Sequence, residues 1–235
     1  MSDNKSYDVV VIGAGPGGYR AAFMAADLGL KTAMIDGQEN PGGVCLYRGC
    51  IPTKALLHLA KVKSEAKKAA DWGMTFEEPK IDREKIKSWK ESVIQRLTGG
   101  LGQLTKARKI DYIRGWAKFT DTNHLTINLV EGEEQQVNFK NAIIATGALP
   151  IKLPFIEEYT DRIMNAEIAL ELKSIPKKIL VVGGGYIGME SATIYHGLGS
   201  EVTLVEATPS GMPTMDLELI KIYMKENKDL FKNKC

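Results

Sequence analysis

The sequence predicts an α/β fold that contains two copies of one strand–helix–strand unit. Residues 8–36 and 178–206 align without a gap at a shift of 170, and each copy begins with an apolar run and a glycine-rich turn. An amphipathic run, a terminating glycine and a second β-branched run follow in both copies, which is the pattern of a helix between two parallel strands. Between the copies, residues 112–139 show the short runs and turn of an antiparallel meander.

Composition excludes several classes of protein. The 235 residues are 44% hydrophobic and 26% charged, as in ordinary globular proteins, so disorder and fibrous repeats are not expected. The net charge of +2 gives no signal for nucleic acid or a membrane surface. No apolar run approaches the ~18 residues that span a membrane, and the amino terminus has no apolar signal core. We therefore expect a cytoplasmic protein.

Each copy carries the three glycines of a dinucleotide-binding turn. They are Gly13, Gly15 and Gly18 in the first copy, and Gly183, Gly185 and Gly188 in the second. The first glycine permits the tight turn, the second lets the backbone approach a pyrophosphate, and the third lets the helix pack close to the strand. Two such sites predict two cofactors, and a flavin with a nicotinamide is the usual pair for hydride transfer.

An acidic residue ends the second strand of each copy, Asp36 in the first and Glu206 in the second. A carboxylate in this position accepts hydrogen bonds from ribose hydroxyls. It also repels a 2′-phosphate, and no arginine follows Glu206 to bind one. The second site is therefore predicted to prefer NAD to NADP.

Two cysteines, Cys45 and Cys50, lie five residues apart just after the first unit. If a helix begins at residue 44, the pair lies near its amino end, where the helix dipole lowers a thiol pKa. The spacing allows a disulfide where the backbone departs from a regular helix, and such a short loop stabilises a fold little. This favours redox chemistry over two buried thiols. A zinc site is the other alternative, but His58 and Cys235 do not complete a recognised ligand spacing, so no metal is predicted.

Residues 42–54, GGVCLYRGCIPTK, resemble the redox-active disulfide motif of the flavin-dependent pyridine nucleotide–disulfide oxidoreductases. The resemblance covers about residues 7–220, and it is strongest to the members that oxidise a dihydrolipoyl dithiol. The supporting stretches are KALLHLAKV, TGGLGQLTKARK, NAIIATGALPIKLP and GGGYIGME. One departure is Leu46-Tyr47-Arg48, where the family commonly has Leu-Asn-Val.

The resemblance implies a role for each site residue. Cys45 would exchange with the substrate dithiol and Cys50 would contact the flavin. Lys54 would lie beside the flavin ring, paired with Glu190, so that its ammonium stabilises the negative charge gained on reduction. The implied FAD-binding residues are Gly13, Gly15, Gly17, Gly18, Asp36, Gly43, Val44, Cys45, Lys54, Ala117, Thr146 and Gly147. The implied NAD-binding residues are Gly183, Gly185, Tyr186, Ile187, Gly188 and Glu206. From the residues alone, Glu190 could also be a solvated helix residue, and Tyr186 could be a packing residue.

The resemblance also implies partners and a domain plan. Partners would be the lipoyl domain of a 2-oxoacid dehydrogenase complex or of the glycine cleavage system, in a role in cell redox homeostasis. Residues 1–150 would form the FAD domain with the redox disulfide, and residues 151–235 the start of a truncated NAD domain. The family's C-terminal dimerisation domain, which supplies a His–Glu base and makes the full-length members homodimers, would be absent.

We therefore expect an N-terminal half that binds FAD weakly and does not turn over lipoamide. Two alternatives stay open: a sibling reductase of small disulfides, and a non-catalytic fragment.

The remaining segments predict supporting elements. Helices are expected over 53–70, 82–106 and 166–172, the last with Asn165 as its cap. Strands are expected over 112–119, 124–130, 135–139 and 141–147. The antiparallel strands should cover the FAD-binding sheet.

Overall fold

A computed structural model describes residues 5–154, 156, 158–160, 162–208, 212, 215–227 and 233–234. The chain forms two compact units: Met1–Ile51 with Ser92–Ile151, and Pro52–Glu91 with Lys152–Cys235. The second boundary lies one residue from the expected division at residue 150. Residues 52–91, expected in the first domain, group with the second unit. The assignment of FAD to one domain and NAD to the other stays a prediction.

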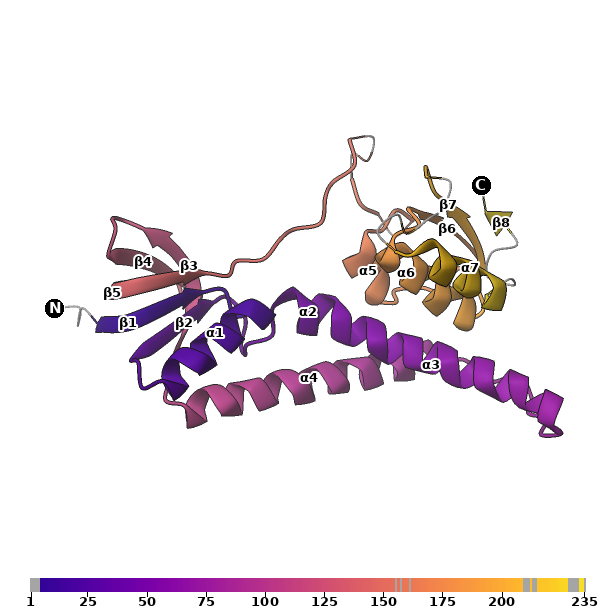
Figure 1. Cartoon of the computed structure of the whole chain (residues 1–235), viewed down its shortest axis with the longest axis horizontal. Helices are drawn as coiled ribbons and strands as arrows, with labels where there is room; N and C mark the ends of the chain where they lie inside the picture. The colour runs from indigo at the N-terminus through magenta and orange to yellow at the C-terminus, as the bar shows by residue number, and fades with distance from the viewer. Residues whose placement is uncertain are drawn as a thin grey trace. The chain divides into compact units, whose positions relative to one another are not determined.

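Five strands of the first unit close into a barrel (Figure 1). They are β1 (Lys5–Ile12), β2 (Thr32–Asp36), β3 (Asp111–Phe119), β4 (His124–Leu129) and β5 (Glu134–Ile144). β1 lies between β2 and β5 and is parallel to both, while β4 runs antiparallel to β3 and β5. The predicted α/β fold with an antiparallel meander is confirmed. The expectation that the meander covers the sheet was wrong, because β3, β4 and β5 belong to the same sheet and close it.

The two strands expected over 135–139 and 141–147 are one strand, β5. Its first half pairs with β4, in a register that places His124 opposite Asn138. Its second half pairs with β1 as far as Ile144, opposite Ile12. Val137 and Asn138 pair with both neighbours, so β5 continues without a break while its sequence pattern changes. Residues 145–147 lie beyond its end.

The apolar run in β1 is buried on both faces. Val10 and Ile12 pack in the barrel core with Leu125, whereas Val9 and Val11 belong to the cluster formed with helix α1 (Pro16–Asp27). Burial on both sides is typical of a central parallel strand with a helix over it, and it explains why this strand reads as a continuous run of valines.

Three further helices lie in residues 43–107. They are α2 (Gly43–Arg48), α3 (Cys50–Lys68) and α4 (Arg83–Ala107), and a 3-10 turn, Ala69–Trp72, follows α3. The helices expected over 53–70 and 82–106 correspond to α3 and α4. The helix expected from residue 44 onward is interrupted at Gly49, so α2 and α3 are separate.

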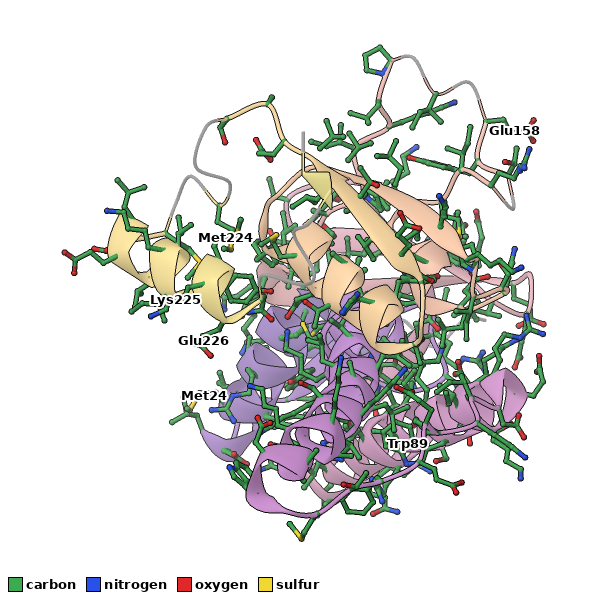
Figure 2. All side chains as sticks on the ribbon, turned by 90° about the vertical axis from the view of Figure 1, so that its right-hand side faces the viewer. Met24, Trp89, Glu158, Met224, Lys225 and Glu226 are labelled. Atoms are coloured by element: carbon green, nitrogen blue, oxygen red, sulfur yellow. The ribbon has the colours of Figure 1, made fainter. Side chains whose placement is uncertain are left out.

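In the second unit, the described residues after Lys152 form a sheet of parallel strands with helices beside it (Figure 1). The strands are β6 (Lys178–Val182), β7 (Glu201–Val205) and β8 (Asn233–Lys234), and the helices are α5 (Ala166–Leu170), α6 (Tyr186–Gly197) and α7 (Leu217–Glu226). The Asn165 side chain accepts a hydrogen bond from the Ile168 N–H at 2.9 Å, so the predicted cap is confirmed although α5 ends two residues early. In the last turn of α7, Met224 is partly buried and packs against the core, while Lys225 and Glu226 are exposed (Figure 2).

A glycine lets α3 and α6 approach closely within the second unit. A Cβ built on Gly197 would lie 2.4 Å from the Ala60 Cβ and 2.8 Å from the Ala60 Cα. Leu56 of α3 belongs to the same core as Met189 of α6, so this contact continues a packed interface. Gly197 was not among the predicted site residues, because only the partner helix shows why glycine is needed.

We expect Gly197→Ala to lower the free energy of unfolding by about 1–2 kcal/mol. Overpacking costs ~1–3 kcal/mol of stability, and the higher helix propensity of alanine offsets less than ~1 kcal/mol of this. Urea unfolding followed by circular dichroism measures the change. Gly197→Ala should cost less in an Ala60→Gly background, because that change removes the Cβ at 2.4 Å although the Cα at 2.8 Å stays. An equal cost in both backgrounds would contradict this explanation.

Candidate dinucleotide and disulfide sites

The first and third glycines of the first turn are required by the packing of the protein. Gly13 has φ +96°, and a Cβ there would lie 2.2 Å from the carbonyl oxygen of Ala145. A Cβ on Gly18 would lie 1.8 Å from the carbonyl oxygen of Gly13. These contacts hold α1, the turn and the segment after β5 together at the carboxyl ends of the strands.

The second glycine of each turn is not required by contacts within the protein. A Cβ on Gly15 would meet only the Gly43 Cα, at 3.8 Å, and a Cβ on Gly185 would meet nothing within 4 Å. Gly17 is equally open. Space beside a glycine at a helix amino terminus suits the close approach of a pyrophosphate. The residues of both turns therefore fit a dinucleotide.

The two copies share their backbone hydrogen bonds at the same shift of 170. The bond from the Gly13 N–H to the Ile35 carbonyl (2.8 Å) corresponds to that from the Gly183 N–H to the Val205 carbonyl (2.8 Å). The bond from the Gly42 N–H to the Ala14 carbonyl (2.8 Å) corresponds to that from the Met212 N–H to the Gly184 carbonyl (3.0 Å). In each copy the segment after the second strand thus returns to the glycine turn. In the first copy that segment leads into the cysteine motif.

Both acidic residues accept hydrogen bonds from the glycine turns. Asp36 Oδ2 accepts from the Ala14 N–H at 2.8 Å. Glu206 Oε1 accepts from the Thr208 N–H at 2.8 Å, and Oε2 accepts from the Gly184 N–H at 2.5 Å. These bonds, that of Thr208 first, hold the pKa of the Glu206 carboxyl below its ordinary value. Glu206 is therefore ionised at neutral pH, beside the second glycine turn.

The cysteine motif begins against the first glycine turn. A Cβ on Gly43, which has φ +58°, would lie 2.5 Å from the Gly15 Cα. Cys45 is half-buried in α2, and Cys50 is exposed as the first residue of α3. Gly49 between them has φ −135° and ψ −106°, which is the departure from helical geometry that a disulfide at this spacing requires.

Tyr47, one of the departures from the family motif, binds the loop before α2. Its hydroxyl donates to the Asn40 carbonyl at 2.9 Å and accepts from the Asn40 N–H at 3.3 Å. Tyr112 donates its hydroxyl to the Gln38 carbonyl at 3.0 Å, and burial raises the pKa of this phenol. Two tyrosines thus fix the loop that joins Asp36 to the cysteine motif.

Lys54 of α3 and Glu190 of α6 form an ion pair within the second unit. Lys54 Nζ and Glu190 Oε1 are 2.5 Å apart, with the two side chains 62% and 26% exposed. The predicted pairing is therefore present. The place of Lys54 beside a flavin remains a prediction.

The other predicted residues lie at the edges of these sites. Tyr186 and Ile187, in the first turn of α6, are exposed, and Val44 is exposed in α2. Ala117 packs against the barrel core, while Thr146 and Gly147 follow β5. Their contacts with cofactors remain predictions.

Sequence reasoning missed Trp116, whose exposed indole lies over Gly37, next to Asp36. The available signal was a large aromatic residue at an outward-facing position of the meander.

The described residues contain no group of three or more His, Cys, Asp or Glu side chains that could hold a metal ion. No helix in the described part of the chain is long and apolar enough to cross a membrane.

Two glycine turns of the dinucleotide-binding type and a cysteine motif whose Gly43 packs against one of them define a class, the nucleotide-dependent redox proteins with an α/β fold. The family model described as pyridine nucleotide-disulphide oxidoreductase matches residues 7–230. The chain belongs to this family.

Curated relatives include dihydrolipoyl dehydrogenases. The chain is 50% identical to that of Vibrio parahaemolyticus over 232 residues, covering 99% of this chain and 49% of the relative. It is 43% identical to that of Bacillus subtilis over 221 residues, covering 94% of this chain and 46% of the relative. The chain thus spans about half the length of the curated relatives it matches.

A solved structure, the Cu(II) complex of an HOCl-induced flavoprotein disulfide reductase from Escherichia coli, matches with a TM-score of 0.82 at 28% identity. The match covers 99% of this chain and 49% of that chain.

Proposed function

We propose that the chain provides the disulfide and dinucleotide sites of a dihydrolipoyl dehydrogenase, which passes two electrons from a dihydrolipoyl dithiol to NAD. The observation that carries the proposal is the packing of the cysteine motif on the first glycine turn, where Gly43 meets Gly15. This contact supports a redox role for Cys45 and Cys50 beside a nucleotide site, and the 50% identity to dihydrolipoyl dehydrogenases supports a dihydrolipoyl substrate.

The cysteine pair performs the first half-reaction by thiol–disulfide exchange. One substrate thiolate attacks Cys45 Sγ, the bond to Cys50 Sγ breaks, and Cys50 leaves as a thiolate. The second substrate thiol loses its proton and attacks the substrate sulfur of the mixed disulfide, which releases Cys45. The substrate becomes a cyclic disulfide, the cysteine pair gains two electrons, and two protons are released.

Bound FAD supplies the carrier that takes these electrons on to the nicotinamide. Asp36 and the first glycine turn would bind its adenosine and pyrophosphate. Gly43, Val44, Ala117, Thr146 and Gly147 would line it. Lys54, held by Glu190, would place a positive charge near the ring.

The second unit would bind the nicotinamide cofactor. Gly183, Gly185 and Gly188 would accept the pyrophosphate, with Tyr186 and Ile187 at the pocket. Ionised Glu206 would bind the ribose hydroxyls and exclude a 2′-phosphate, which favours NAD. The partner would be a lipoyl domain of a 2-oxoacid dehydrogenase complex or of the glycine cleavage system. Reversible thiol chemistry fits the reducing cytoplasm.

The half-reaction can be tested on this chain with Cys235→Ser as the background. Oxidised chain is mixed with dihydrolipoamide, and lipoamide and protein thiols are counted by mass spectrometry. We expect one lipoamide and two protein thiols per chain, and we expect dihydrolipoamide to reduce the protein disulfide much faster than glutathione does. In Cys50→Ser, oxidised lipoamide should trap a mixed disulfide on Cys45, whereas Cys45→Ser should trap far less.

Equal rates for the folded chain and the chain unfolded in guanidinium would overturn the proposal. A preference for glutathione would favour the small-disulfide reductase.

A further inference from the structure

An exposed indole lies at the carboxyl end of β2, beside Asp36. Trp116 is 63% exposed. A Cβ built on Gly37 would lie 2.9 Å from Cζ2 and 3.2 Å from Cε2 of Trp116. The indole therefore covers the backbone of the residue that follows Asp36, and a side chain at position 37 would occupy the same space.

The strand register places Trp116 at the ligand-binding edge of the sheet. Asp36, the last residue of β2, is opposite Arg114 of β3, so Trp116 lies two residues beyond the end of β2. Ligands of parallel α/β sheets bind at the carboxyl ends of the strands. Side chains alternate along a strand, and Ala117 packs against the barrel core, so Trp116 points away from the barrel interior.

We propose that Trp116 is a stacking platform for the adenine ring of the dinucleotide whose ribose binds Asp36. This inference rests on the proposed FAD site. Adenine is bonded directly to the ribose, so a ribose held at Asp36 brings the base close to residue 37 and to the indole above it. An exposed indole face binds a purine by stacking, which is a common way for proteins to hold bases.

The two copies differ at this position, which makes the platform a feature of the first site. In the second copy Ala207 follows Glu206 where Gly37 follows Asp36. Trp116 therefore favours adenine binding at the first nucleotide site, and its emission reports on that site.

The chain has three tryptophans, so a single reporter can be made. Trp72 and Trp89 belong to the second unit, whereas Trp116 belongs to the first. In the double variant Trp72→Phe/Trp89→Phe, Trp116 is the remaining indole. The indole is excited at the red edge of its absorption while ADP is added. ADP should quench the Trp116 emission, and the quench should saturate. The matched variant Trp116→Phe, which keeps Trp72 and Trp89, should show no saturable quench.

Affinity is measured by the anisotropy of FAD, with FMN as a control ligand that lacks the adenosine. We expect Trp116→Ala to weaken FAD binding roughly 5- to 150-fold, the range found when a stacking aromatic is removed. Trp116→Phe should stay within about threefold of the original chain, because a phenyl face still stacks. Gly37→Val, which displaces the indole without changing it, should weaken FAD as Trp116→Ala does. FMN binding should be the same in every variant.

Two results would overturn the platform: Trp116 emission unchanged by ADP at concentrations where FAD binds, or Trp116→Ala binding FAD as well as the original chain. Both would leave the proposed flavin site intact. An ADP quench without FAD binding would uphold the adenine platform and contradict the flavin part of the proposed function.

Discussion

Gly18→Ala is expected to lower the free energy of unfolding of the chain by about 3 kcal/mol. The new Cβ would lie 1.8 Å from the Gly13 carbonyl oxygen and 2.8 Å from the carbonyl carbon. Both are backbone atoms, so the overlap is relieved only if α1 moves away from the turn after β1. Forced overpacking in a well-packed region costs ~1–3 kcal/mol, and this site lies at the upper end because no flexible side chain can yield. Urea unfolding of the purified chain measures the loss.

The adjacent residue provides the control. Gly17 lies in the same helix, and a Cβ there would meet nothing within 4 Å. Alanine in place of a helical glycine raises stability by roughly 0.5–1 kcal/mol, so Gly17→Ala should be neutral or stabilising. Both variants change the unfolded chain in the same way, and their difference isolates the contact with Gly13. Equal stability of the two variants would show that α1 is free to move.

Lys54→Met should slow the reduction of bound flavin by dihydrolipoamide about 100-fold, with little change in stability. A fixed charge that meets charge developing in a reaction is worth ~10²- to 10³-fold in rate. The Lys54–Glu190 pair is partly exposed, and such pairs contribute only ~0–1 kcal/mol to folding. The rate is followed by the loss of flavin colour in stopped flow, with the chain saturated with FAD.

Lys61→Met is the matched control. Lys61 lies on the same helix and forms an exposed ion pair with Glu65, Nζ to Oε1 3.6 Å. Its removal changes the net charge equally and should leave the rate unchanged. Glu190→Gln should slow reduction less than Lys54→Met, because it releases the ammonium without removing it. The same rate for Lys54→Met and Lys61→Met would exclude a role for Lys54 in electron transfer.

Patterns within short segments were enough to predict much of the fold and of the sites. The glycine turns, the acidic residues 23 positions beyond each first glycine, the cap Asn165 and the two long helices all depend on neighbours close in sequence. Turn geometry, capping and helical periodicity are local properties, so they can be predicted from a single sequence. The repeat gave the glycine turn and the acidic residue a second copy.

Errors arose where strands pair across long distances. The closure of the barrel joins β1 to β5, with Ile12 opposite Ile144. Nothing near either residue indicates this partner, so β5 was divided in two and the meander was expected to form a cover. Residues 52–91, expected in the first domain, group with the second unit, in whose core Leu56 packs.

The sequence by itself predicted the chemistry of this protein: two nucleotide sites, a cysteine pair encoded between them, and a preference for NAD. Only the tertiary structure showed which glycines are required by contacts within the protein and which leave room for a ligand. It also showed that Gly197 admits Ala60 and that an indole covers the residue after Asp36. These features depend on contacts between residues far apart in the chain, and such contacts exist only after the backbone has brought the segments together.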